Sequence, residues 1–229
     1  MIDVAADAGY LTTTLTIMNM LQCIKQARWP EESTLLTLPK LKSRMLNYIK
    51  HPRSKKPLTC LAELMQYSDK QIRTIFENVP GLSPNDLNEI QRVVGRLPNM
   101  DVTTTIVSKK PYLIPETAYK IQVQLSRRGN KRGTHDGKVY APQFPKPQSE
   151  SWWLVMGDPE TDELLALKRI SMRNGPNETL GNKATSTINF ETPVHLGKHK
   201  YAMYLMCDGY LGLDQQLDIE FETRVDLDS

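Results

Sequence analysis

The stretch Tyr119-Lys-Ile-Gln-Val-Gln-Leu125 alternates apolar and polar residues without a break. This period of two is typical of a strand that buries one of its faces. Six further segments after residue 99 are short and separated by Pro, Gly and Asn; they cover residues 102–107, 152–156, 164–170, 185–190, 201–206 and 217–225. Seven short strands with no helix between them predict an antiparallel β-sandwich of the immunoglobulin or fibronectin type over residues 99–229.

Upstream of residue 99 the apolar period becomes that of helices. Residues 11–28 carry apolar side chains at helical spacing, and Trp29-Pro30 ends the pattern because proline disfavours helical geometry in the residue before it. Residues 12–14 are expected to cap this helix, and apolar residues on many of its sides predict that neighbouring elements wrap it. Its polar residues Thr12, Thr16, Asn19 and Gln26 fall on one stripe.

Shorter helices are predicted for residues 40–50, 58–67, 69–77 and 84–96, with Ser83 as the N-cap of the last one. Residues 52–57 form a basic, irregular connection. The predicted fold class is therefore α+β and multidomain. It comprises the end of a helical bundle in residues 1–57, a helix-loop-helix in residues 58–98 and an immunoglobulin/fibronectin-like antiparallel β-sandwich in residues 99–229.

Composition places the chain among globular proteins. Of its 229 residues 39% are hydrophobic and 24% are charged, and the net charge is +3. The basic excess lies in residues 1–98, and residues 33–62 hold seven Lys and Arg without any acid. Three cysteines in no metal-like spacing predict reduced thiols and a cytoplasmic or nuclear location. No apolar run is long enough for a membrane span, and the chain begins in the middle of a pattern, as a piece cut from a longer protein would.

The sequence contains no motif that is typical of an enzyme active site. It contains no Gly-rich phosphate loop followed by Lys-Ser or Lys-Thr, no nucleophile elbow, and no histidine pair at metal-binding helical spacing. His195 and His199 flank a turn, where they could form a two-histidine metal site or remain solvated. We therefore expect no catalytic residue, no metal and no cofactor in this chain.

Two basic clusters could contact nucleic-acid phosphates or remain solvated: Lys50, Arg53, Lys55 and Lys56 in the acid-free stretch, and Arg127, Arg128, Lys131 and Arg132. Because few aromatic residues accompany them, any binding of RNA or DNA is expected to be weak and independent of base sequence. Residues 79–83 could form a phosphate-binding helix-hairpin-helix or an ordinary αα-hairpin. Trp152 and Trp153 must face opposite sides of their strand, so Trp153 could pack under a loop or contact a protein partner.

Several motifs resemble, in order, the Sec-sixty-three module. They are Asp3-Val-Ala-Ala, Gly9-Tyr-Leu11, Gln26-Ala-Arg-Trp29, Leu38-Pro39, Ser151-Trp-Trp-Leu-Val-Met-Gly-Asp158, Leu165-Ala-Leu-Lys-Arg169 and Tyr204-Leu-Met-Cys-Asp-Gly-Tyr-Leu-Gly-Leu-Asp-Gln215. The module is named for a translocon J-protein and also follows the helicase cores of large Ski-two-like helicases. Residues 12–15, Asn19 and residues 33–38 and 211–216 look most like the helicase subunit of the activating signal cointegrator complex and its fungal ribosome-quality-control counterpart, with the spliceosomal U5 helicase next.

The resemblance implies a non-catalytic C-terminal part of an ATP-dependent RNA or DNA helicase. Its partners would be the other domains of the parent helicase and the proteins of a helicase complex. Residues 11–28 would correspond to the ratchet helix that lines the nucleic-acid channel, with Thr12, Thr16, Asn19 and Gln26 facing the strand. Two alternatives stay open: a weak nucleic-acid-binding module acting through residues 33–62, and a translocon-type protein-interaction domain, which fits less well because no J motif or membrane span is present.

Overall fold

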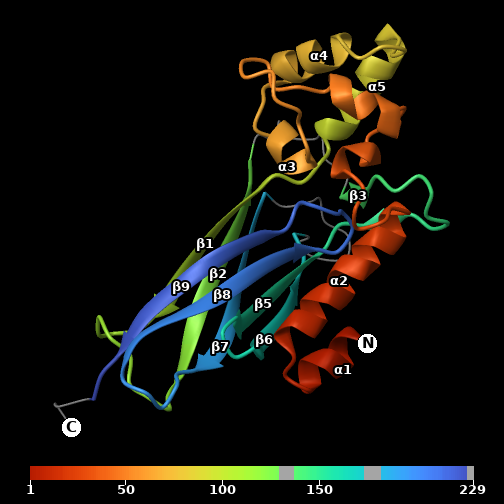
Figure 1. Cartoon of the computed structure of the whole chain (residues 1–229). Coiled ribbons are helices and arrows are strands. Elements are labelled where there is room, and N and C mark those ends of the chain that lie inside the picture. Colours follow the sequence, from red (N-terminus) through yellow and green to blue (C-terminus); the bar gives the residue numbers. More distant parts are fainter. Residues whose placement is uncertain (129–136, 173–181, 226–229) are drawn as a thin grey trace.

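The computed structural model describes residues 1–128, 137–172 and 182–225 (Figure 1). Its helices are α1 (Ile2–Asp7), α2 (Leu11–Gln26), α3 (Leu61–Leu64), α4 (Asp69–Glu77) and α5 (Pro84–Val94), with 3-10 turns at Thr34–Thr37 and Ser43–Tyr48. Its strands are β1 (Met100–Val107), β2 (Ala118–Arg127), β3 (Lys138–Val139), β4 (Gln148–Ser149), β5 (Trp152–Asp158), β6 (Glu163–Ile170), β7 (Lys183–Glu191), β8 (Gly197–Cys207) and β9 (Gln215–Thr223).

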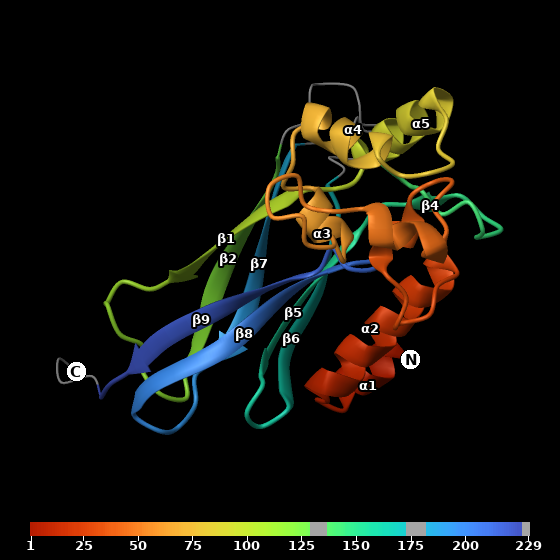
Figure 2. The ribbon, with the colours of Figure 1, turned by 45° about the horizontal axis from the view of Figure 1, so that its top comes forward.

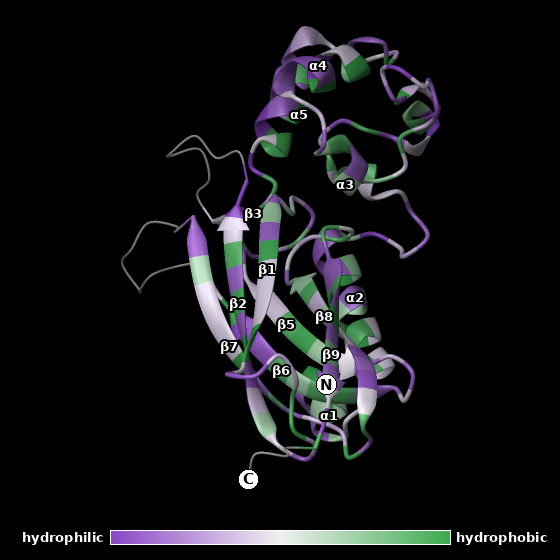
Figure 3. Cartoon of the chain, turned by 90° about the vertical axis from the view of Figure 1, so that its left-hand side faces the viewer, coloured by the Kyte–Doolittle hydropathy of each residue, from purple (hydrophilic) through white to green (hydrophobic). Residues whose placement is uncertain are grey.

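The seven predicted strands form the two layers of a β-sandwich, which confirms the predicted fold class. One sheet has the order β1-β2-β7 and the other the order β6-β5-β8-β9, and every pair in them is antiparallel. The alternation of β2 buries Ile121, Val123 and Leu125 completely, while the polar residues between them stay exposed. Figure 3 shows this alternation as changing colour along β2. The two-residue strands β3 and β4 were not predicted.

α4 and α5 form where the sequence predicts them, because each has a capping box at its start. Ser83 accepts a hydrogen bond from the amide of Asp86, and the Asp86 carboxylate accepts one from the amide of Ser83. Ser68 and Gln71 play the same roles for α4.

Two expected helices are wrong in extent. The helix predicted for residues 40–50 is only the 3-10 turn Ser43–Tyr48, because it has no side-chain cap and Ile49 is already extended. The helix predicted for residues 58–67 is only the single turn α3. The reason is that the amide of Leu58 donates to the carbonyl of Ile49, which holds the chain before α3 in an extended pairing.

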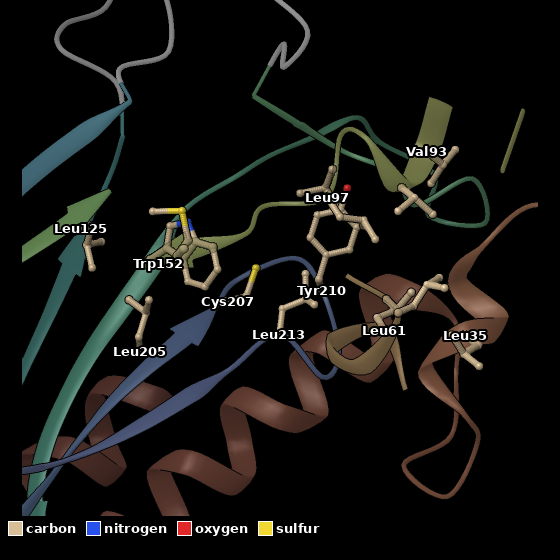
Figure 4. Packing of buried hydrophobic residues seen from close by; sticks show 14 of the residues in the cluster. Leu35, Leu61, Val93, Leu97, Leu125, Trp152, Leu205, Cys207, Tyr210 and Leu213 are labelled. Carbon is tan, nitrogen blue, oxygen red and sulfur yellow. The ribbon is translucent and has the colours of Figure 1, made fainter. Parts of the chain in front are cut away.

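The helical segments and the sandwich share one buried core. Leu35 and Leu61 from the helical part lie in the same cluster as Trp152, Leu205 and Tyr210 from the sandwich (Figure 4). α3, α4 and α5 sit beyond one end of the strands, while α1 and α2 lie along the four-stranded sheet (Figure 1). No helix in the described ranges is both long and apolar enough to cross a membrane.

Candidate functional site

The candidate site is the long helix α2, which the sandwich anchors at its start. The backbone amide of Leu11 donates to the carbonyl of Asp162 at 3.1 Å, and that of Thr12 donates to the Asp162 carboxylate at 2.7 Å. Hydrogen bonding from the side chain and the amide of Thr12 holds the pKa of Asp162 below its ordinary value. The expectation that residues 12–14 cap the helix is therefore wrong: the cap comes from the turn between β5 and β6.

The middle of α2 packs on the outer face of the four-stranded sheet. Leu11 and Met18 form a buried cluster with Val155 and Met206, and Trp153 is partly buried against it. Gly157 permits this approach, because a Cβ atom there would lie 2.8 Å from the Leu11 side chain. The described residues cover only one side of α2, so they do not wrap the helix as the sequence predicted.

The last turns of α2 bind residues 207–214, which we call the junction loop. The Gln22 amide donates to the carbonyl of Cys207 at 2.6 Å and to the Asp214 carboxylate at 3.0 Å. The Gln26 amide donates to the carbonyl of Gly209 at 2.7 Å. These three partners lie more than 180 residues away in the sequence, so spacing along the helix could not reveal them.

A charged network reinforces the junction loop. Lys25 donates to the Asp208 carboxylate at 2.8 Å, and Ser151 and Arg169 each donate to its other oxygen at 2.7 Å. Burial raises the pKa of Asp208, but the hydrogen bonds from Lys25 and Ser151 and the charges of Lys25 and Arg169 outweigh it, so its pKa lies below the ordinary value. The carboxylate therefore stays charged and holds three segments together.

Asp214 behaves in the opposite way. Burial raises its pKa to about 6, although the amide of Cys207 donates to its carboxylate at 2.6 Å and Gln22 also donates to it. No cation is paired with this carboxylate within the described residues. The junction loop thus holds one carboxylate compensated by cations and one held only by neutral donors.

The junction loop is also where the helical part meets the sandwich. Tyr210 is fully buried, and its hydroxyl accepts a hydrogen bond from the amide of Tyr140 at 2.7 Å. A Cβ atom at Gly209 would lie 2.4 Å from Val139, and one at Gly212, whose φ is +79°, would lie 2.7 Å from Thr34. The glycines of the motif are thus explained by close packing.

The open side of α2 carries Thr12 and Thr16, which are exposed, and Asn19, which is half-buried. Beside them runs a groove of about 460 Å³, lined by Met20, Ile24, Trp29 and other residues of the end of α2. The side chains of Met20, Ile24 and Trp29 are 58%, 53% and 76% exposed. The sequence pattern did not identify these three residues as part of a functional surface. Apolar side chains that continue after residue 19, with no predicted element to cover them, could have indicated it.

Gln26 does not belong to the open side, which corrects the predicted stripe. Its side chain is 5% exposed, because its amide donates hydrogen bonds to the carbonyls of Tyr140 and of Gly209 in the junction loop. The structure therefore keeps Thr12, Thr16 and Asn19 together and separates Gln26 from them.

The basic residues of residues 50–57 form an exposed hairpin. An isolated bridge joins Lys50 to Pro57, and the amide of His51 donates to the carbonyl of Lys56 at 2.8 Å. The side chains of Lys50, Arg53, Lys55 and Lys56 are exposed, and the described parts of the chain provide no ion pair for them. His51 lies 2.6 Å from the Tyr67 hydroxyl, so the hairpin belongs beside α3 and not beside α2.

Two residues that were expected to face a protein partner do not do so. Arg127 is buried and pairs with Glu150 at 2.6 Å, each side chain being 1% exposed, and the Trp152 ring nitrogen donates to the same carboxylate. Trp153 packs beneath α2, with the Arg169 guanidinium 5.2 Å from its ring centre. Arg128 is exposed and pairs with Asp101. Lys131 and Arg132 lie outside the described residues.

Metal-binding geometry is not found in the described residues. They contain no group of three or more His, Cys, Asp or Glu side chains that could hold a metal ion. The ring of His199 lies 2.9 Å from the carbonyl of His195, a contact to backbone.

The chain is similar to known proteins over nearly its whole length. The family model described as the Sec63 Brl domain matches residues 1–220. DExH-box ATP-dependent RNA helicase DExH13 of Arabidopsis thaliana is 31% identical, over 98% of this chain and 10% of that protein. Activating signal cointegrator 1 complex subunit 3 of Gallus gallus is 30% identical, over 96% of this chain and 11% of that protein.

The U5 small nuclear ribonucleoprotein 200 kDa helicase of Drosophila melanogaster is also 30% identical, over 96% of this chain and 9% of that protein. The chain spans about a tenth of the length of these relatives. Because the match covers α1, α2, the junction loop and nearly all of the sandwich, the chain belongs to the Sec63 Brl domain family.

Proposed function

We propose that this chain is a non-catalytic module of a large ATP-dependent, Ski2-like helicase of the cytoplasm or nucleus, and that it holds α2 against the path of the nucleic acid. Two of the relatives that support this are named as helicases, and two are named as parts of a complex or ribonucleoprotein. Its partners would be the other domains of the helicase and the proteins of its complex.

One observation carries the proposal: α2 is anchored along one side and open along the other. Asp162 holds its start, the four-stranded sheet its middle, and the junction loop its end. A helix fixed in this way keeps its open face in a constant position, as a surface that positions a polymer requires. Thr12, Thr16 and Asn19 on that face can donate to and accept from phosphates, sugars and bases.

The test places a negative charge on the open face in the full-length helicase that carries this module. Thr16→Asp should lower strand unwinding by about tenfold or more, because a carboxylate repels the phosphate backbone. Thr74→Asp in α4 is the matched control, since both threonines are exposed and both hydroxyls donate to the carbonyl four residues earlier. Equal unwinding by the two variants, at equal thermal stability, would overturn the proposal.

The exposed basic hairpin favours a second candidate function, weak binding of RNA or DNA by the isolated chain. Lys50, Arg53, Lys55 and Lys56 could all contact phosphates, but no exposed aromatic ring lies within residues 50–57. Such binding would be independent of base sequence and would fall steeply as salt rises. Binding that persists at high salt would exclude the hairpin as its source.

A further inference from the structure

β1 is an edge strand that, among the described strands, pairs with β2 alone. Each of the two main sheets has two edge strands, and natural proteins protect such edges with charges, bulges or covering segments. Lys168 donates to the carbonyl of Thr187 in β7, and β6 carries Lys168 and Arg169. β9 carries three acids and is paired at its end with Leu113, whose amide donates to the carbonyl of Glu222 at 2.8 Å.

In the described residues, β1 carries such a protection only at its start, where Asp101 pairs with Arg128. Residues 102–107 read Val-Thr-Thr-Thr-Ile-Val, without a charge or a proline. The register between β1 and β2 runs over eight residue pairs without a shift. β1 lies at the outside of its sheet (Figure 2).

The register shows which backbone groups of β1 face outward. The amide of Arg128 donates to the carbonyl of Asn99 at 2.8 Å, and residues alternate along an antiparallel pair between bonding the neighbour and pointing away. Val102, Thr104 and Ile106 therefore point their amides and carbonyls away from β2. The carbonyl of Met100, the preceding outward group, already accepts from Gln215 at 2.8 Å, so the open row begins at Val102.

The two ends of this row differ in chemistry. At its start lies a groove of about 600 Å³ with a mixed lining, in which Met65 and Val102 lie beside the ion pair of Asp101 and Arg128. Beyond its end Lys109 is exposed, and the described parts of the chain provide no ion pair for it. Among the described residues, the edge thus presents a groove of mixed lining, a row of backbone groups without a strand partner, and a cation.

We propose that the β1 edge binds an extended segment of a partner protein, which adds a fourth strand to the β1-β2-β7 sheet. Backbone groups of this kind are complementary to another strand, and alternate side chains then provide specificity. The segment carries apolar, β-branched residues opposite Val102, Thr104 and Ile106, and an acidic residue beside Lys109. This interaction is independent of the proposed role of α2.

The test uses the full chain and a capped heptapeptide with the sequence of residues 120–126, the strand that already pairs with β1. Two N-methylated versions serve as matched probes. Methylation at the positions of Ile121, Val123 and Leu125 blocks the amides that would face β1, while methylation at Gln122 and Gln124 blocks amides that would face away. The first version should bind at least about tenfold more weakly than the second. Only the amides that the first version lacks would donate hydrogen bonds to β1, whereas the amides that the second version lacks would face away from it.

Amide hydrogen exchange measured by NMR shows where on the chain the peptide binds. The peptide should protect the amides of Val102, Thr104 and Ile106. Thr104→Pro should abolish binding without disturbing the bonds to β2, because the missing amide faces outward. Equal binding of the two methylated peptides, protection confined to other elements, or no binding would each overturn the proposal. Self-association of the chain that Thr104→Pro abolishes would also overturn it, since the occupant would then be a second copy.

Discussion

Asp214 connects the end of α2 to the sandwich through a carboxylate that no described cation balances. Burial raises its pKa in the folded state to about 6, against an ordinary value of 3.8. Below pH 4 the group is protonated in both folded and unfolded chains. Between about pH 4 and pH 6 the unfolded chain ionises this group while the folded chain keeps it protonated, so the wild type loses stability over this range. Above about pH 6 both states are ionised and the loss is complete.

Asp214→Asn removes this titration and keeps an acceptor for the amide of Cys207. The free energy of unfolding of the variant, relative to wild type, should rise by about 2 kcal/mol between pH 4 and pH 7, because one pKa unit is worth about 1.4 kcal/mol. Urea unfolding at the two pH values measures it. A difference between the two proteins that is the same at both pH values would contradict the assignment.

At the scale of one element, α2 has a bound side and an open side. The side-chain amides of Gln26 and Asn19 lie on the bound side and the open side, respectively. Gln26→Ala should lower the free energy of unfolding by about 1 to 3 kcal/mol, because it leaves the buried carbonyl of Gly209 without its donor. Asn19→Ala on the open side should cost less than about 0.5 kcal/mol. Thermal or urea unfolding of both variants tests this, and similar losses for both would mean that the two sides are not distinct.

At the scale of the whole molecule, the hairpin of residues 50–57 is exposed while the core on either side of it is continuous. Trypsin should therefore cleave first between Lys50 and Leu58. The two fragments should stay together in native gel filtration, because α2 remains bound to the sheet and the junction loop. Early cleavage inside residues 152–206 would contradict the domain organisation that we propose.

Charge reversal tests the same hairpin as a nucleic-acid contact. Lys55→Glu with Lys56→Glu should remove most of any binding of the chain to single-stranded RNA or DNA, while Asn19→Ala should change it little. The double variant Lys120→Glu with Lys198→Glu has the same net charge and alters exposed lysines of the sandwich, so it serves as the control. Fluorescence anisotropy at several salt concentrations measures both. Equal losses in the two double variants would point to overall charge and not to the hairpin.

The sequence by itself determined the elements whose cause is local. The alternation in residues 119–125 and its counterparts predicted all seven long strands, and Ser83 before Pro84 predicted the start of α5. Side-chain period and capping act within a few residues, so a single sequence contains that information. The family motifs were readable for the same reason, as ordered runs of residues.

Only the tertiary structure decided which side of each element is buried. Gln26 looks like part of a polar stripe until the junction loop covers it, and Arg127 looks like a surface cation until Glu150, 23 residues later, pairs with it. The cap of α2 comes from Asp162, about 150 residues away. Contacts between distant residues leave no local period in the sequence, because the hydrogen bonds that bury these polar groups form only when the helix and the two sheets pack together.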